Sequence, residues 1–525
     1  MQMGNPIKGI KKLYFYNCIF EGYSQIKNCE AEVIEFIGCS FKNDPLKLEL
    51  NKSNLLSITF SVTGKINING LYNDIFISNN ELSEFILKDV NNEYSLSESE
   101  IVSINNKIKK FKIISSSLYS KIKFNAGNYD TIDLSGTFNE SILLEGEVEV
   151  KNLILESSIF KNRIDINEGI YKYITFYRSV FDGLIWFNSY DVLTNSERNL
   201  KIHSLSIHSN NFEKNYTLSL SQINTLDLSN NNFKKLFTFN SKKPETTSDD
   251  NSTMMSMDGV NQGNIVVEDA NLHLNISGVN LGNMYFKNIA TTTLHLSDFQ
   301  NNGNISFSDI IFGNFFVINK STVGKLAFLN TNLEIFDELV ISDSSLSSVD
   351  FSNYPFNIKS YSTNPQIGYG LKDKSLNKTN LKNVYNQLKK SAKNKGDIDT
   401  ANRYQSLEYR YLLFSKKIGF DKVLLFLNWI SNNFGRSWFQ GMFFTFLIAF
   451  ACFLGYLNIL QKDFFYPDLV KDYIFFISSF PKLELDKFSV TPKIWDISLI
   501  IWISRIFISY GIYQTIAAFR KYGKS

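Results

Sequence analysis

The sequence has few histidines and cysteines, and it lacks the nucleotide- and metal-binding motifs and the export signal that would indicate an enzyme or a secreted protein. Only 4 histidines and 4 cysteines occur in 525 residues, and no two cysteines form a CxxC pair. A P-loop, a dinucleotide-binding fingerprint and a zinc-ligand spacing are all missing. The first 20 residues contain no apolar run long enough for export. We therefore expect no catalytic, cofactor or metal site, no enzymatic activity, and an N-terminal region that stays in the reducing cytosol.

A strong charge of one sign is also lacking. Lys and Arg number 54 against 51 Asp and Glu, for a formal net charge of +3. Such a chain has no global field that attracts nucleic acid, so we expect no nucleic-acid partner. Proline is scarce as well, with 8 residues, whereas phenylalanine is abundant, with 46.

Phenylalanine recurs at a spacing of 21 residues in the N-terminal part of the chain. Three pairs of similar segments end at Phe20 and Phe41, at Phe160 and Phe181, and at Phe212 and Phe233. In each segment a bulky apolar residue lies five positions before the Phe. A small or polar residue lies two positions before it: Cys18, Cys39, Ser158, Ser179, Asn210 and Asn231. A fixed period of this length predicts a solenoid, in which Cys18 and Cys39 are small packing residues.

Two kinds of solenoid fit this local pattern. The segment from Ile223 to Phe233 also matches the leucine-rich-repeat template. Elsewhere, apolar residues recur at steps of five, from Ile318 to Leu333 and from Ile341 to Phe356. Steps of five leave no room for a separate convex segment, and four steps of five plus one residue give the period of 21.

The five-residue pattern resembles that of the bacterial pentapeptide-repeat family, whose A(D/N)LXX unit places a small residue and a Leu or Phe inward. ANLHL from Ala270 is a near-literal copy, and STVGK from Ser321 and SSLSS from Ser344 are looser ones. The resemblance covers roughly residues 10–360 and is weaker in two stretches, 42–70 and 90–150. It implies a mainly β fold, a right-handed parallel β-helix.

We assign residues 1–365 to this solenoid and expect about 16 coils, a rod of about 80 Å at the spacing of stacked strands. Residues 241–262 interrupt the pattern with polar residues of low β propensity, which predicts a disordered insertion.

Residues 371–434 have helical spacing and predict a linker. Gly396 separates two helices that resemble a single tetratricopeptide-like unit, with Asp397 or Asp399 as the cap of the second. One copy forms no peptide groove, so a spacer is expected. A third segment, from Phe420 to Asn432, is apolar except for one polar stripe. It fits either an interfacial membrane helix or a core helix of the linker.

Residues 435–525 predict a membrane domain with two spans, about 442–460 and 497–519. Trp438 and Trp495 precede the spans, as expected for membrane-interface anchors on opposite sides. The segment 472–486 between the spans is too short to cross a bilayer and predicts a re-entrant or interfacial segment.

The second span carries two polar faces. Ser498, Arg505 and Ser509 share one face, which we expect to line a polar interior or a pore, although an Arg that draws water inward without function is an equal alternative. Ser504, Gly511 and Thr515 form a small-residue face suited to close helix packing and to assembly as a homo-oligomer.

Basic residues lie before the first span and after the second: Lys416, Lys417, Lys422, Arg436, Arg520, Lys521 and Lys524. They predict that the solenoid and the C-terminus are both cytoplasmic, in a bacterial inner membrane.

We hypothesise a non-enzymatic scaffold whose cytosolic rod recruits or senses an unknown protein while the bilayer holds its anchor. The alternative is an oligomeric two-span ion channel or pore gated by the solenoid. A bacterial stress or phage-defence effector shares this layout by analogy alone.

Overall fold

The computed structural model describes residues 7–22, 24–42, 46–59, 65–88, 100–187, 190–191, 196–197, 200–220, 223–240, 252–311, 313–331, 336–342, 344–346, 349–351, 374–415, 419–459, 467, 469–478 and 492–522. The chain divides into two units. The first contains Met1–Ser344 and Asp350–Ser362, and the second contains Ser345–Val349 and Thr363–Ser525.

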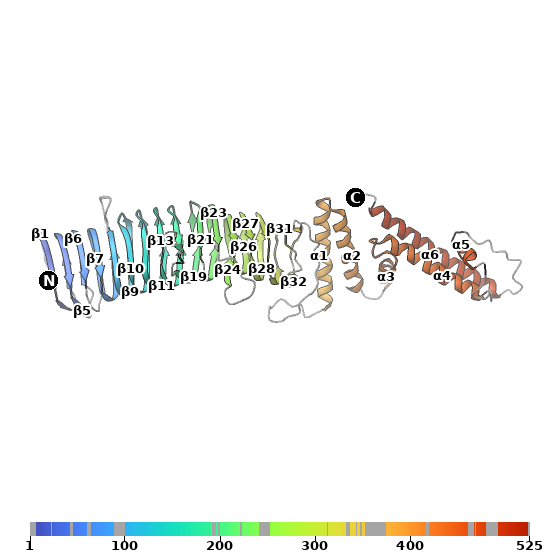
Figure 1. Ribbon diagram of the computed structural model, residues 1–525, viewed down its shortest axis with the longest axis horizontal. Coiled ribbons are helices and arrows are strands. Elements are labelled where there is room, and N and C mark those ends of the chain that lie inside the picture. The colour runs from blue at the N-terminus through green and yellow to red at the C-terminus, as the bar shows by residue number, and fades with distance from the viewer. Residues whose placement is uncertain are drawn as a thin grey trace. The chain divides into compact units, whose positions relative to one another are not determined.

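The first unit is a parallel β-solenoid of about 13 turns (Figure 1). Its N-terminal strands are β1 (Ile7–Tyr16), β2 (Ile19–Glu21), β3 (Ser24–Lys27), β4 (Cys29–Ile37), β5 (Ser40–Lys42), β6 (Leu46–Thr59), β7 (Lys65–Ser78), β8 (Glu81–Lys88), β9 (Glu100–Leu118), β10 (Lys121–Phe138), β11 (Ile142–Glu156), β12 (Ile159–Phe160), β13 (Ile164–Ile166), β14 (Gly169–Tyr177), β15 (Val180–Phe181) and β16 (Ile185–Phe187). The mainly β solenoid expected from the repeat is confirmed.

The solenoid continues in the same parallel register beyond residue 200. Its remaining strands are β19 (Leu200–His208), β20 (Asn211–Phe212), β21 (Tyr216–Ser219), β22 (Ile223–Ser229), β23 (Asn232–Asn240), β24 (Thr253–Met257), β25 (Val260–Glu268), β26 (Asn271–Asn280), β27 (Asn283–Lys287), β28 (Ala290–Asn301), β29 (Asn304–Ser308), β30 (Gly313–Asn319), β31 (Lys325–Leu329), β32 (Phe336–Ser342) and β33 (Asp350–Phe351). A short antiparallel pair, β17 (Tyr190–Asp191) and β18 (Ser196–Glu197), lies between the two groups.

The repeated phenylalanines form columns of stacked rings inside the solenoid. From Phe138 through Phe160, Phe181 and Phe212 to Phe233, neighbouring ring centroids lie 5.0, 5.1, 5.1 and 4.9 Å apart, and all five side chains are buried. One coil alone leaves its Phe in water, so stacking supplies the stabilisation, at roughly 25 cal/mol per Å² of buried apolar surface.

Buried residues occur in pairs two apart, and the pairs recur at steps of five. Leu205 and Ile207 are buried on one side, and Asn210 and Phe212 on the next. This spacing agrees with the step of five read from the sequence.

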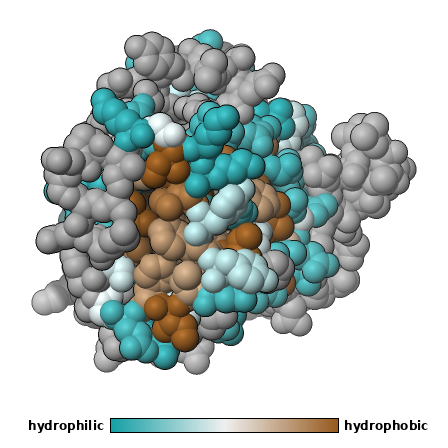
Figure 2. Space-filling view, turned by 90° about the vertical axis from the view of Figure 1, so that its left-hand side faces the viewer, coloured by the Kyte–Doolittle hydropathy of each residue, from teal (hydrophilic) through white to brown (hydrophobic). Residues whose placement is uncertain are grey.

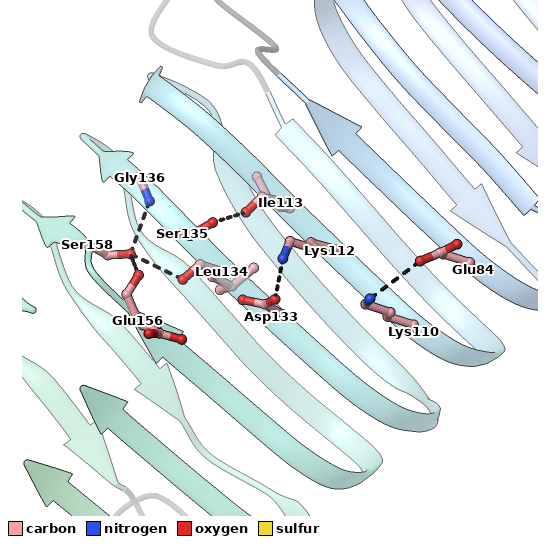
Figure 3. Close-up of polar contacts among 10 residues, drawn as sticks. All are labelled: Glu84, Lys110, Lys112, Ile113, Asp133, Leu134, Ser135, Gly136, Glu156 and Ser158. Carbon is pink, nitrogen blue, oxygen red and sulfur yellow. Dashed lines mark hydrogen bonds and ion pairs between the residues drawn. The ribbon is translucent and has the colours of Figure 1, made fainter. Parts of the chain in front are cut away.

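The small residues two before the repeated Phe residues, continued by Asn261 in the following coil, form a hydrogen-bond ladder along the solenoid. The backbone N–H of each member donates to the side-chain oxygen of the next: Gly136 to Ser158, Ser158 to Ser179, Ser179 to Asn210, Asn210 to Asn231 and Asn231 to Asn261, at 2.9–3.2 Å. Figure 3 shows its start, where the Ser158 hydroxyl lies within 2.7 Å of the Glu156 carbonyl. Buried polar groups are costly unless paired, so the ladder explains why this position is small and polar.

Two stretches with a weak sequence repeat still belong to the solenoid. The long strands β6, β7, β9, β10 and β11 pair in parallel, with irregularities at Glu49/Asn51 and Asn125/Gly127. Such bulges shift the spacing of buried residues and so obscure the period in the sequence.

The prediction of a disordered insertion over 241–262 is wrong for its C-terminal half. Strand β24 (Thr253–Met257) pairs with β22 and β26, and Met255 and Met257 are fully buried. Residues 241–251 lie outside the described part of the chain. The ladder members Asn231 and Asn261 are 30 residues apart, so this turn of the solenoid is longer than the 21-residue period. The longer turn shifts the next repeat along the sequence. Longer turns also explain why there are about 13 rather than the expected 16.

The second unit contains α1 (Lys374–Asn394), α2 (Ile398–Ser415), α3 (Phe420–Asn432), α4 (Trp438–Ile459), α5 (Leu469–Ser478) and α6 (Pro492–Tyr522). Helices α1 and α2 form the expected hairpin, and apolar residues of α1 such as Leu381, Val384 and Leu388 are buried. Gly396 adopts φ +78° between them, and the Asp397 carboxylate accepts a 3.0 Å hydrogen bond from the Thr400 N–H. Asp397 is therefore the cap.

The hairpin contains a buried ion pair that the sequence did not reveal. Lys389 Nζ lies 2.6 Å from Glu408 Oε2, and Asn386 donates to the other carboxylate oxygen at 2.6 Å. The segment Ser345–Val349 belongs to this unit because the Val349 carbonyl accepts a hydrogen bond from the Ser391 hydroxyl on α1 at 2.8 Å.

Candidate functional site in the apolar helices

Helices α4 and α6 pack closely through two reciprocal glycine–threonine contacts. A Cβ added to Gly511 would lie 2.2 Å from Thr445 Oγ1, and one added to Gly441 would lie 2.8 Å from Thr515 Oγ1. Each threonine hydroxyl bonds the carbonyl four residues earlier, at 2.8 and 2.9 Å. Small residues let two helices approach, so Gly511 and Thr515 serve packing within one chain.

Ser504, the third member of the predicted packing face, is fully buried, and its hydroxyl donates to the Ile501 carbonyl at 2.7 Å. The structure thus directs all three predicted packing residues into the unit. The assembly of several chains through this face stays a prediction.

Arg505 lies against the C-terminal end of α5. Its Nη1 donates to the Ile477 carbonyl at 3.4 Å, and its guanidinium carbon lies 5.7 Å from the centre of the Phe476 ring. The last carbonyls of a helix lack partners within the helix and carry partial negative charge. The short helix therefore provides the arginine with electrostatic compensation and a cation–π contact.

Helix α5 packs beside the middle of the two long helices. Phe476 joins Phe453 of α4 and Ile508 of α6 in one buried cluster. The Tyr473 hydroxyl donates to the Phe446 carbonyl at 2.5 Å, about 12 Å along α4 from its first residue. Helix α5 thus lies alongside the long helices rather than beyond their ends.

The predicted polar face of Ser498, Arg505 and Ser509 is not gathered around one space. Arg505 is half-buried against α5, whereas Ser509 is exposed on the outer surface of α6 and Ser498 is half-buried. The predicted anchors are exposed at opposite ends of the helix pair. Trp495 is 81% exposed, and the Trp438 ring lies 4.9 Å from that of Phe519 near the end of α6.

Helix α3 presents its polar side to α6. Asn432 is buried, and its amide donates to Gln514 Oε1 at 2.6 Å and to the Gln514 carbonyl at 3.1 Å. Tyr510 donates to Asn428 at 3.5 Å. The opposite side is exposed and apolar: Phe420, Val423, Leu424, Phe426 and Ile430. The apolar side that a core helix would bury is thus exposed in the described chain, which favours the interfacial interpretation.

The outer surface of α4, α5 and α6 is apolar in the same way. Its large exposed side chains are Phe439, Phe443, Phe446, Leu447, Phe450, Val470, Ile474, Phe475, Leu499, Trp502, Ile506, Ile512, Ile516 and Phe519. Two helices, Trp438–Ile459 and Trp495–Arg520, are long and apolar enough to cross a membrane, and only 28% and 22% of their most apolar windows are buried. Core helices of a soluble protein would be mostly buried.

In the part of the chain that the structure describes, no three His, Cys, Asp or Glu side chains gather where they could hold a metal ion. No family model, curated protein or solved structure matches this chain.

Proposed function

We propose that the chain is a non-enzymatic, membrane-anchored scaffold protein, in which helices α3–α6 insert into the bilayer and the solenoid recruits or senses a protein partner in the cytosol. The resemblance to pentapeptide repeats, supported by the buried pairs at steps of five, points to a bacterial inner membrane. The lipid bilayer is the anchor's partner.

The inverted distribution of polarity in α3–α6 carries this proposal. Asn432, Thr445, Ser504 and Gln514 are buried, whereas phenylalanines and leucines cover the outside. In water such a surface exceeds the apolar patches that soluble proteins expose, whereas in hydrocarbon it is the favourable arrangement. Helix α3 supports the same conclusion because only an apolar solvent favours its apolar side facing outward.

The orientation follows from the basic residues at one end of the helix pair. The Trp438–Phe519 contact places the start of α4 and the end of α6 at the same level, so Arg436 and Arg520 flank the spans on the same side. By the positive-inside rule that side is cytoplasmic. Helix α5, which returns beside the spans, is then a re-entrant segment approaching from the opposite side.

The position of Arg505 favours an anchor over a channel. An intramembrane arginine needs compensation, and here the carbonyl end of α5 and the Phe476 ring supply it within one chain. A conduction path lined by Arg505 is therefore not required to explain the residue. The gated oligomeric channel is the alternative outcome of the experiment below.

Membrane integration is tested by expressing the full chain in bacteria and extracting the membranes with alkaline carbonate. The protein should stay in the membrane pellet, and a cysteine introduced at Ser525 should be labelled only after the cytoplasmic side is exposed. Release by carbonate would contradict the anchor.

Ion flux through liposomes holding the purified full chain separates the two functions. The scaffold predicts no flux for the wild type, for Arg505→Gln or for Arg505→Lys. Flux that depends on voltage or salt and that changes in Arg505→Gln, but less in the charge-preserving Arg505→Lys control, would establish a channel in place of the scaffold.

A further inference from the structure

The apolar core is incompletely buried at the N-terminal end of the solenoid. The core-facing residues of the first coil are only half-buried, whereas their register partners one coil later are buried. Leu13 lies beside Ile34 and Phe15 beside Phe36, and both partners are fully buried. Figure 2, which views this end, shows an apolar centre surrounded by a hydrophilic rim.

The same end presents a strand with one unoccupied edge among the described residues. Strand β1 pairs in parallel with β4 only, whereas β4 pairs with β1 on one side and with β6 on the other. An unpaired edge offers a row of backbone donors and acceptors to an added strand. Backbone pairing and apolar stacking would therefore favour the same occupant, an extended protein segment.

Charge decides which kind of segment fits. Along the solenoid, ion pairs join register partners on neighbouring coils, as Lys110 with Glu84 and Lys112 with Asp133 do in Figure 3. Further examples are Lys42 with Glu21, Lys27 with Glu49, Lys65 with Glu84, Lys107 with Glu81 and Lys121 with Glu100.

The three lysines of β1 form no such pair among the described residues, as is also true of some lysines on inner coils, for example Lys109, Lys151 and Lys172. Lys8, Lys11 and Lys12 are exposed, and none of them forms an ion pair with a residue that the structure describes. Lys12 lies beside Val33 across the strand pair. Among the described residues no coil lies on the outer side of β1, so no acidic side chain there pairs with its lysines.

We propose that β1 is a docking site for an extended protein segment that carries acidic residues between aliphatic ones and adds in parallel as one more strand. Aliphatic side chains would cover Ile10, Leu13 and Phe15, and carboxylates would lie over the lysines. A second copy of this chain fits less well, because it would bring two sets of three lysines together. The only acid of the first coil, Glu21, is already 3.5 Å from Lys42.

This inference rests on the proposed scaffold function, and it identifies the surface and the chemistry of the partner. The probe is a fluorescent peptide with the sequence of β4, Cys29–Ile37, with serine in place of its cysteine. This peptide has three glutamates and already pairs in parallel with β1 in the fold. Its binding to the purified full chain in detergent is measured by fluorescence polarisation.

The peptide should bind, and the triple variant Lys8→Glu, Lys11→Glu, Lys12→Glu should weaken its binding at least about tenfold. The same variant should bind a peptide in which lysines replace the three glutamates. The matched control, Lys109→Glu, Lys151→Glu, Lys172→Glu, changes exposed lysines of inner coils and should leave binding unchanged.

Three results would overturn the docking site: no binding, equal loss in the control variant, or sedimentation showing that β1 pairs two copies of the chain. Carbonate extraction of the same proteins keeps the two proposals apart. Lost peptide binding with membrane retention refutes only the docking site, whereas carbonate release with intact peptide binding refutes only the anchor.

Discussion

The two units of this protein solve the problem of burying polar groups in opposite ways. In the solenoid, rows of Phe, Leu and Ile occupy the interior, and the polar interior is limited largely to ladders such as the one from Ser158 to Asn261. In helices α3–α6 the largest apolar side chains face outward, and polar side chains such as Asn432 and Gln514 join the helices inside.

Different interactions therefore stabilise the two units. In water, removing apolar surface drives folding, and buried hydrogen bonds mainly avoid a penalty. Under the proposed insertion into the bilayer, apolar contacts between helices give little net gain over contacts with lipid, so close packing at Gly511 and Gly441 and internal hydrogen bonds become decisive. The helical hairpin of α1 and α2 follows the first rule and contains one buried ion pair.

That ion pair is where we expect the largest single effect. Glu408→Ala leaves the Lys389 charge nearly buried without its partner, and should lower the free energy of unfolding of the hairpin by about 3–5 kcal/mol. Loss of helical circular dichroism on heating measures it. The double variant Lys389→Met, Glu408→Leu should recover most of the lost free energy of unfolding. If it does not, the ion pair stabilises the hairpin by more than the neutralisation of one buried charge by the other.

The solenoid ladder should show the next largest effect. Asn231→Ala leaves the Asn210 N–H and the Ile207 carbonyl without their side-chain partner, at a cost of about 2–4 kcal/mol. Urea unfolding followed by β-sheet circular dichroism measures it. The control Asn211→Ala removes an exposed amide and should change little. Equal effects of both variants would show that the ladder is dispensable.

High pH should destabilise the solenoid through its buried tyrosines. Burial raises the pKa of Tyr129 to about 12 and also raises the pKa of Tyr171. The unfolded chain loses these protons near pH 10 while the folded chain keeps them, so stability is full below pH 10 and falls as the pH rises toward 12, by up to roughly 2–3 kcal/mol for Tyr129. Unfolding midpoints between pH 8 and 12 measure the loss. Tyr129→Phe should flatten the curve, and the exposed Tyr119→Phe should not.

One added methyl group should disturb the close packing of helix α4 against helix α6. Gly511→Ala brings a Cβ against Thr445 and should cost about 1–3 kcal/mol of helix packing. Thermal aggregation of the detergent-solubilised protein measures it. Gly455→Ala meets only the flexible end of Ile500 and is the matched control. If Gly511→Ala leaves the midpoint of thermal aggregation unchanged, helices α4 and α6 lie further apart than described.

The smallest effect is expected on the outside of the solenoid. Lys121 and Glu100 form a half-exposed pair at 3.8 Å, so Lys121→Met should change the free energy of unfolding by about 0–1 kcal/mol. Urea unfolding at low and high salt checks it. A larger loss would mean that pairs between coils, and not only the stacked core, stabilise the solenoid.

Much of the fold was predictable because its signals are local. The 21-residue recurrence of Phe, the small residue two before it and the helical break at Gly396 each reflect a backbone requirement that neighbouring residues meet. The same method failed at Thr253–Met257, because a longer turn displaced the period and the strand has only methionines as its apolar residues. Gly511 and Thr515 could be recognised as packing residues by their small size. Lys389 and Glu408 could not be recognised as a buried ion pair, because a sequence does not distinguish buried charged residues from exposed ones.

The solenoid, the helical hairpin and the two long apolar helices could all be predicted from the sequence, because periodicity and hydropathy are properties of consecutive residues. The partners of the isolated polar residues depended on tertiary structure alone. Arg505 lies against the end of α5, and Asn432 bonds Gln514, 82 positions away. A polar group takes the partner that the folded chain brings within about 3 Å, and no spacing along the sequence specifies that distance.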